Sequence, residues 1–256
     1  MNALPPWIVF HVPHDSFYIP PEVRRTILLS DTELDREFLC MTDVWTQALF
    51  AAGVPRSQVT AAPVSRLVVD TERFEDDALE VMSARGMGVV YEVTHDLKPL
   101  RRKVSKEERE LLLERWYRPH HQILTQRVDR ILERWGRALV IDVHSFPSKA
   151  LPYEDDAFAP RPEICIGTDG FHTPPEAAAA FTEVFARAGW DTGLNSPFAG
   201  ALVPMKHYGR DRRVSAVMIE TRRDVYADEL TGALRPDFMR RASEIRRAVA
   251  AAAEAL

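Results

Sequence analysis

The chain has few cysteines, few glycines and no long hydrophobic run. Its 256 residues include two cysteines, Cys40 and Cys165, and 11 glycines. The two cysteines form no CxxC pair, which excludes a disulfide-rich scaffold and predicts two buried free thiols in a reducing compartment. No segment reaches the roughly 18 consecutive apolar residues that a membrane span needs, and the start of the sequence has no secretory pattern. We therefore expect a cytoplasmic protein that does not span a membrane.

Neither sign of charge dominates the sequence. Lys and Arg total 33 and Asp and Glu total 38, which gives a formal net charge of -5. This balance argues against non-specific nucleic-acid binding and favours a small or zwitterionic ligand. With 46% hydrophobic and 28% charged residues the chain is neither disordered nor collagen-like. No repeat, linker or shift in composition divides it, so we expect a single domain over residues 1–256, although length alone would permit two.

Short apolar runs alternate with stretches of helical periodicity along the chain. This alternation is typical of an α/β fold with a largely buried sheet and flanking helices. The expected strands cover residues 7–12, 65–69, 138–143, 163–167 and 214–220. The expected helices cover residues 31–52, 105–135, 174–188 and 237–256. Pro119 is predicted to kink or break the second of these helices.

Histidines and carboxylates collect where the apolar runs stop, which is where open α/β sheets place ligand sites. His14 follows the first run, and His144 follows the run that starts at residue 138. Two neutral imidazoles and one carboxylate, with one position left open, form the ligand set of a catalytic zinc ion. The alternative is that each histidine only caps a loop by hydrogen bonding.

The carboxylate of this ligand set has two candidates. Asp43 lies in an apparently helical or pre-helical stretch, where an ordinary surface aspartate or N-cap is the simpler explanation. Asp15 adjoins His14 and could instead orient its ring without touching the metal. The residues alone do not separate these two possibilities.

Glu220 lies at the end of an apolar run that predicts a central strand. Desolvation at such a position raises the pKa of a carboxyl group toward the range useful for general acid and base catalysis. The alternative is a structural ion pair between Glu220 and Arg222 or Arg223.

Two arginines, Arg66 and Arg73, flank a segment that also carries Asp70 and Glu72. Arginine binds carboxylates in a bidentate manner, so this segment could hold an acidic substrate. A mutual salt-bridge cluster among the four side chains is an equally good explanation. Two further candidates for ligand contact are histidines near breaks in the pattern, where structural hydrogen bonding is more common: His121 and His207.

Seven short motifs occur in an order that resembles the N-formylglutamate amidohydrolase family. They are VPHDS, TDVW, SRLVVDTERF, RPHH, IDVHSF, GALVPMKHYG and MIETRRDVY. The resemblance extends over nearly the whole chain and implies a zinc carboxypeptidase-like and aspartoacylase-like core. Such a core is a mixed, largely parallel central sheet with flanking helices and a metal, Zn²⁺ or another divalent ion, at one edge.

Carried over by motif, the resemblance implies a role for each candidate. It assigns the metal to His14, Asp43 and His144, and it makes Glu220 the base that activates the attacking water. Arg66 is expected to act in catalysis by polarising the scissile carbonyl. The expected substrate-binding residues are Arg73, His121, His207 and Arg222.

The expected activity is hydrolysis of a linear amide bond in a small N-acyl amino acid, with N-formylglutamate cleaved to formate and glutamate. The absence of Gly-x-Ser-x-Gly and of an activating cysteine motif argues against a covalent nucleophile. Alternatives are a peptidase or amidase on the same scaffold and a catalytically silent binding protein. The chain departs from the family at Glu72, where asparagine is usual. Glu72 adds negative charge beside the expected anion-binding arginine.

Overall fold

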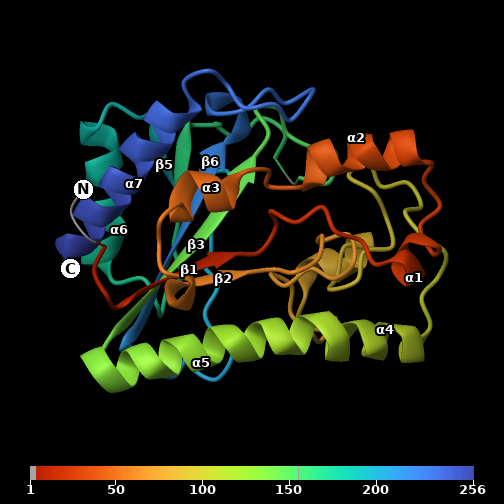
Figure 1. The fold of residues 1–256 in the computed structure, drawn as a ribbon, viewed down its shortest axis with the longest axis horizontal. Coiled ribbons are helices and arrows are strands. Elements are labelled where there is room, and N and C mark those ends of the chain that lie inside the picture. The colour runs from red at the N-terminus through yellow and green to blue at the C-terminus, as the bar shows by residue number, and fades with distance from the viewer. Residues whose placement is uncertain (1–3, 155) are drawn as a thin grey trace.

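The computed structural model describes residues 4–154 and 156–256, and a six-stranded sheet lies at its centre (Figure 1). The strand order is β2-β1-β3-β6-β4-β5. β2, β1, β3 and β6 run parallel to one another, β4 is antiparallel to β6, and β5 is parallel to β4. The predicted mixed, largely parallel sheet is therefore confirmed. The strands are β1 Ile8–Val12, β2 Val59–Ala61, β3 Ala138–Phe146, β4 Ile164–Gly167, β5 Thr192–Leu194 and β6 Val214–Arg222.

One face of the sheet carries the largest hydrophobic cluster. Side chains alternate between the faces of a strand, so Phe10, Ile141 and Val217 lie on this face together. Three helices cover it, namely α3 (Thr46–Ala51), α6 (Pro175–Arg187) and α7 (Phe238–Glu254). Figure 1 shows α6 and α7 side by side against this part of the sheet. The largest hydrophobic core lies here.

The opposite face is apolar at one end and polar at the other. Val9, Val140 and Ala216 pack with Leu124 and Val128 of the long helix α5 (Arg118–Trp135). Further along the same strands the residues facing this side become polar. β1 and β3 pair His11 with Asp142, and β3 and β6 pair His144 with Glu220.

The predicted helix over residues 31–52 is wrong, because two shorter helices occupy this stretch. α2 (Asp31–Met41) ends at an extended Thr42, and α3 begins after Trp45, whose φ of 66° is left-handed. The carboxylate of Asp15 accepts hydrogen bonds from the backbone N–H groups of Trp45 (2.7 Å) and Gln47 (2.9 Å). These hydrogen bonds satisfy two backbone N–H groups at the start of α3, so they favour a break between α2 and α3 over one continuous helix.

The predicted strand over residues 65–69 is also wrong. This segment forms turns, with the Val68 N–H donating to the Ser65 carbonyl at 2.8 Å. Val68 and Val69 pack in a separate cluster with Val89 and Leu113 rather than in the sheet. The strand beside β1 at this edge of the sheet is instead β2, which the apolar pattern did not predict.

Pro119 does not break its helix. α4 (Lys106–Leu112) continues through a π-helical turn, Leu113–Tyr117, directly into α5. Pro119 has no N–H to donate to the carbonyl of Arg115, so the chain widens one turn earlier and then resumes as an α-helix. The remaining short elements are α1 Pro21–Arg24 and the 3-10 turns Arg56–Gln58, Val81–Arg85 and Arg223–Val225.

The two cysteines differ in environment. Both thiols are free, as expected, and Cys165 is buried, but Cys40 is only half-buried. The prediction that both thiols are buried is therefore wrong for Cys40. No helix in residues 4–154 or 156–256 is long and apolar enough to cross a membrane.

Candidate metal centre and active-site cavity

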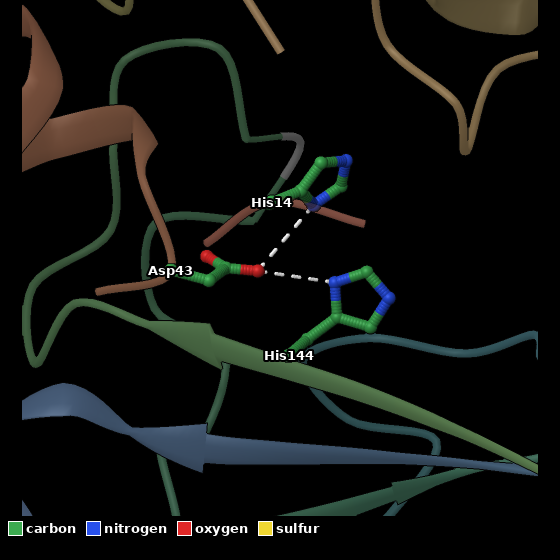
Figure 2. Close-up of side chains that lie close together, drawn as sticks. All are labelled: His14, Asp43 and His144. Carbon is green, nitrogen blue, oxygen red and sulfur yellow. Dashed lines mark hydrogen bonds and ion pairs between the residues drawn. The ribbon is translucent and has the colours of Figure 1, made fainter. Parts of the chain in front are cut away.

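The three predicted metal ligands lie together at the carboxyl end of the sheet (Figure 2). His14 lies just after β1, Asp43 lies between α2 and α3, and His144 is in β3. The Asp43 Oδ2 atom is 3.4 Å from His14 Nδ1 and 3.1 Å from His144 Nδ1. Each residue is at most 5% exposed. We call these three residues the outer cluster.

A carboxylate holds the second ring nitrogen of each histidine in the outer cluster. His14 Nε2 lies 2.8 Å from Asp70 Oδ1, and His144 Nε2 lies 3.2 Å from Asp142 Oδ1. These carboxylates direct both Nδ1 atoms toward Asp43, as outer carboxylates do in zinc sites. His14 Nδ1 is buried and has no hydrogen-bond partner. The donor set therefore fits a divalent ion of the zinc type.

The geometry separates the two aspartates that the sequence left open. Asp15 uses both carboxylate oxygens at the start of α3, and burial raises its pKa to about 7. Asp43 lies between the two imidazoles. Burial alone would raise the pKa of Asp43, but the adjacent His14 and His144 rings hold that pKa well below the usual range. Of the two aspartates, Asp43 is the one whose carboxylate lies close to both histidine rings.

Asp70 connects Arg66 to the outer cluster. Arg66 donates to Asp70 Oδ2 through Nε (3.2 Å) and Nη2 (2.8 Å), and the Tyr91 hydroxyl donates to the same oxygen. Burial would raise the pKa of Asp70, but Arg66 and His14 hold it well below the usual range. The salt-bridge explanation therefore describes Arg66, whose guanidinium is committed to the carboxylate that orients His14.

A cavity of about 430 Å³ opens beside the outer cluster, and Glu220 is part of its wall. Glu220 is 8% exposed, and its Oε2 atom has no hydrogen-bond partner. Burial is the main reason that its pKa rises to about 8. Among the described residues no ion pair joins Glu220 to an arginine. Arg222 instead binds Asp224 (2.7 Å), and Arg223 donates to the Leu39 carbonyl (2.6 Å).

Two other predicted residues line the cavity. Arg73 is 21% exposed, and its guanidinium lies 3.8 Å from Asp70 and 3.9 Å from Glu80. These distances exceed normal hydrogen-bond lengths, so Arg73 keeps donors for a ligand. Burial lowers the pKa of His121 to about 4, which leaves a neutral imidazole whose Nε2 has no partner.

The structure places two predicted substrate-binding residues outside the cavity wall. His207 Nε2 lies 2.9 Å from Asp129 Oδ1. Arg222 binds Asp224 and donates to the Arg161 carbonyl at 2.6 Å. In this structure both side chains are engaged in these contacts and neither lines the cavity, so their substrate-binding role stays a prediction.

A second group of the same residue types lies deeper, and the sequence reasoning did not identify it as a unit. His11 Nδ1 is 2.9 Å from both Glu72 Oε1 and Asp142 Oδ1, and His11 Nε2 is 2.8 Å from His120 Nε2. Burial alone would lower the pKa of His11, but hydrogen bonds with Asp142 and Glu72 raise it to about 9. We call His11, Glu72 and Asp142 the inner cluster. Only strand register brings His11 and Asp142 together.

The fold and the cavity define a mixed α/β protein with a two-histidine, one-carboxylate site at the edge of its sheet. The chain belongs to the N-formylglutamate amidohydrolase family, whose family model matches residues 7–227.

Two relatives carry the name N-formylglutamate deformylase. The protein from Pseudomonas putida is 32% identical over 179 residues, which are 68% of this chain and 65% of that protein. The protein from Pseudomonas aeruginosa is 33% identical over 175 residues, 66% of this chain and 64% of that protein. The chain thus matches just under two thirds of the length of each relative.

Solved structures share the fold. A crystal structure of N-formylglutamate amidohydrolase from Ralstonia eutropha JMP134 has a TM-score of 0.82 at 23% identity, covering 99% of this chain and 94% of that one. A gene product of Agrobacterium tumefaciens has a TM-score of 0.69 at 21% identity, covering 97% of this chain and 90% of that one. At these identities the likeness concerns the fold alone.

Proposed function

We propose that the chain is a metal-dependent hydrolase that cleaves N-formylglutamate to formate and glutamate. One observation carries this proposal: the outer cluster and the unpaired carboxylate of Glu220 share one cavity. Their closeness follows from the register of β3 and β6, which pairs His144 with Glu220. The two Pseudomonas relatives, both named for deformylation of N-formylglutamate, support the choice of substrate.

His14, Asp43 and His144 would hold the metal, for which zinc is the first expectation. When bound, a zinc-type ion supplies Lewis acidity at this end of the cavity. Asp70 and Asp142 fix the two imidazole rings from behind.

Glu220 is the proposed general base. Its burial and its pKa of about 8 keep the carboxyl group close to the balance between its protonated and ionised forms near neutral pH. The ionised form accepts a proton from the attacking water, and the protonated form then donates it to the leaving amine. No covalent intermediate with the protein is required.

Arg73 is the proposed site for the substrate carboxylate, because it lines the cavity and its donors are not committed. The neutral His121 contributes a further hydrogen bond from the wall. Arg66 acts through Asp70 on the orientation of His14, so we propose it as a positioning residue in place of the catalytic role expected from the sequence.

The test is formate release from N-formylglutamate by the purified protein, together with metal analysis. The comparison panel consists of N-acetylglutamate, an N-formyl amino acid with an uncharged side chain, and a dipeptide. Faster cleavage of another panel member would reassign the substrate within the same scaffold. A metal-loaded protein that hydrolyses none of them would be a binding protein. Glu163→Gln, outside the cavity wall, is the matched control and should retain full activity.

A further inference from the structure

A second cavity, of about 480 Å³, lies at the β2 edge of the sheet. Residues of α3, β2, the π-helical turn and the first half of α5 form its walls, and Figure 1 shows β2 between α3 and α5. Among the described residues it shares no lining residue with the cavity beside the outer cluster. Its volume is within the range of small-molecule sites, about 300–1,000 Å³. The walls include Arg56, Arg115, Trp116, His120, Ile123 and Arg127.

The second cavity is positively charged. Three arginines line it, Arg56, Arg115 and Arg127, and none of its described lining residues is acidic. The cavity beside the outer cluster, in contrast, carries several carboxylates, including Glu80 and Glu220. The whole chain has a formal net charge of -5, so an all-positive cavity is a local feature. Its charge favours an anionic ligand.

Two of the three guanidinium groups have no counter-charge. Arg115 is ion-paired with Glu22 at 2.7 Å, which offsets its charge. Arg127 donates to the β2 backbone and, at 2.7 Å, to the Thr60 hydroxyl, so it is fixed on the edge strand by uncharged partners. In the described part of the chain no carboxylate pairs with Arg127 or with the exposed Arg56. Two uncompensated positive charges therefore lie beside β2.

A buried ring nitrogen also lies in the wall of the second cavity. His120 is 3% exposed, and its Nδ1 atom has no hydrogen-bond partner of normal geometry. Its Nε2 atom is 2.8 Å from His11 Nε2. Burial lowers the pKa of His120 well below its usual value, and the Ala61 backbone opposes this effect only weakly.

The contact with His11 determines which nitrogen of His120 carries the proton. Hydrogen bonds with two carboxylates raise the pKa of His11 to about 9, so His11 is protonated near neutral pH and donates from Nε2. The neutral His120 accepts this bond at Nε2 and carries its own proton on Nδ1. A buried N–H group without a normal hydrogen bond requires an acceptor, which an oxygen atom of a ligand would supply.

The uncompensated charges and the buried donor are separated along the cavity. His120 and Arg127 are seven residues apart on α5, which is about two turns or about 10 Å along the helix axis. They therefore lie on the same side of α5, with Ile123 between them in the wall. A matching ligand is anionic at one end and has an oxygen acceptor at the other.

We propose that the second cavity binds a small phosphomonoester, with its phosphate group between Arg56 and Arg127 and an oxygen of its organic part at His120 Nδ1. A phosphomonoester carries a charge of about -1.5 to -2 at pH 7, which matches two guanidinium groups better than a single carboxylate does. Guanidinium groups also bind phosphate oxygens in a bidentate manner. The volume leaves room for a sugar or a nucleoside, and Trp116 adds an aromatic ring to the wall.

The first experiment is titration calorimetry on the folded full chain in a phosphate-free buffer. The probes are ribose 5-phosphate, AMP, inorganic phosphate and ribose. We expect both phosphomonoesters to bind, inorganic phosphate to bind at least about tenfold more weakly because it cannot reach His120, and ribose to show no binding. Tighter binding of AMP would assign the site to nucleotides, and tighter binding of ribose 5-phosphate would assign it to sugar phosphates.

The second experiment repeats the titrations on three variants. Arg56→Gln and Arg127→Gln should each weaken binding of the phosphomonoesters by about tenfold or more. Arg130→Gln is the matched control, because Arg130 lies on α5 outside the second cavity, and its affinity should stay within about twofold. If Arg127→Gln fails to fold, Arg56→Gln decides, since Arg56 is exposed.

A third titration excludes binding of the phosphate group to a metal. Treatment of the protein with a chelator should leave the affinity unchanged, because the second cavity contains none of the three residues of the outer cluster. Loss of binding after chelation, equal losses in Arg56→Gln and Arg130→Gln, or no binding of either phosphomonoester would overturn the proposal. Each titration measures binding without turnover, so the result is independent of the proposed function.

Discussion

The outer and inner clusters contain the same residue types but use them differently. In the outer cluster both histidines turn Nδ1 toward Asp43 and the cavity, and one of these nitrogens has no hydrogen-bond partner. In the inner cluster His11 uses both ring nitrogens, one on two carboxylates and the other on His120. The comparison shows that the directions of the ring nitrogens, rather than the residue types, distinguish the two clusters.

The two clusters share one carboxylate. Asp142 Oδ1 is 2.9 Å from His11 Nδ1 and 3.2 Å from His144 Nε2. The inner cluster therefore supports the outer one from behind, and changes to the two should have different consequences. Four predictions test this difference.

The largest effect is expected from removing a ligand of the outer cluster. His144→Ala should reduce the metal content from about one ion per chain to near zero and abolish formate release, because two protein ligands do not hold a catalytic zinc. Asp43→Ala should do the same, whereas Asp15→Ala should keep the metal and lower only the melting temperature. Metal analysis of the purified variants measures this. Equal metal loss in Asp15→Ala would transfer the ligand role to Asp15.

The next effect concerns the carboxylate that faces the outer cluster without belonging to it. Glu220→Gln keeps the size of the side chain but cannot accept a proton, so kcat should fall by about 10²- to 10⁴-fold with the metal retained. Glu163→Gln, away from the cavity, is the control. Retention of more than about a tenth of the activity, a cost below roughly 1.4 kcal/mol, would remove Glu220 from the mechanism.

Substitutions of the two arginines should have different effects, because Arg66 is proposed to support the metal ligands and Arg73 to bind the substrate. Arg66→Lys loses one of the two hydrogen bonds that Arg66 donates to Asp70 Oδ2, so metal affinity should fall by about 10- to 100-fold. Arg73→Lys should keep the metal but lower kcat/KM for N-formylglutamate by roughly tenfold. It should change kcat/KM little for an N-formyl amino acid with an uncharged side chain. Metal titration and kinetics on both substrates measure the split. Similar losses of Arg73→Lys on both substrates would indicate a structural role.

The smallest effect is a pH dependence from the inner cluster. The pKa of His11 is raised to about 9 in the folded chain, against an ordinary value of about 6.5. Protonated His11 therefore stabilises the fold fully below about pH 6.5, and this contribution is lost as the pH rises through about 9. The melting temperature of His11→Gln should decline less steeply between pH 7 and 10 than that of the unmodified chain. Parallel declines would show that His11 is neutral.

The sequence predicted some parts of the structure and missed others for identifiable reasons. The central strands were predictable because they are continuous apolar runs, and His14 and His144 were identifiable because they follow such runs. The segment 65–69 is equally apolar but packs in a local cluster, which a pattern of hydrophobic residues does not distinguish from a strand. The break at residues 42–45 depends on Asp15, about 30 positions earlier, so helical periodicity alone did not predict it.

By itself the sequence determined which residue types are present and which strand ends deliver them, because apolar runs and their polar ends are local properties of the chain. Only the tertiary structure placed Asp43, rather than Asp15, beside both imidazoles and paired Arg66 with Asp70. The tertiary structure also places His207 and Arg222 outside the cavity wall and pairs His11 with Asp142. Each of these outcomes depends on the direction of a side chain and on a partner distant in sequence or in an adjacent strand. Strand register and packing fix the direction of each side chain and the identity of its partner, and composition encodes neither of these.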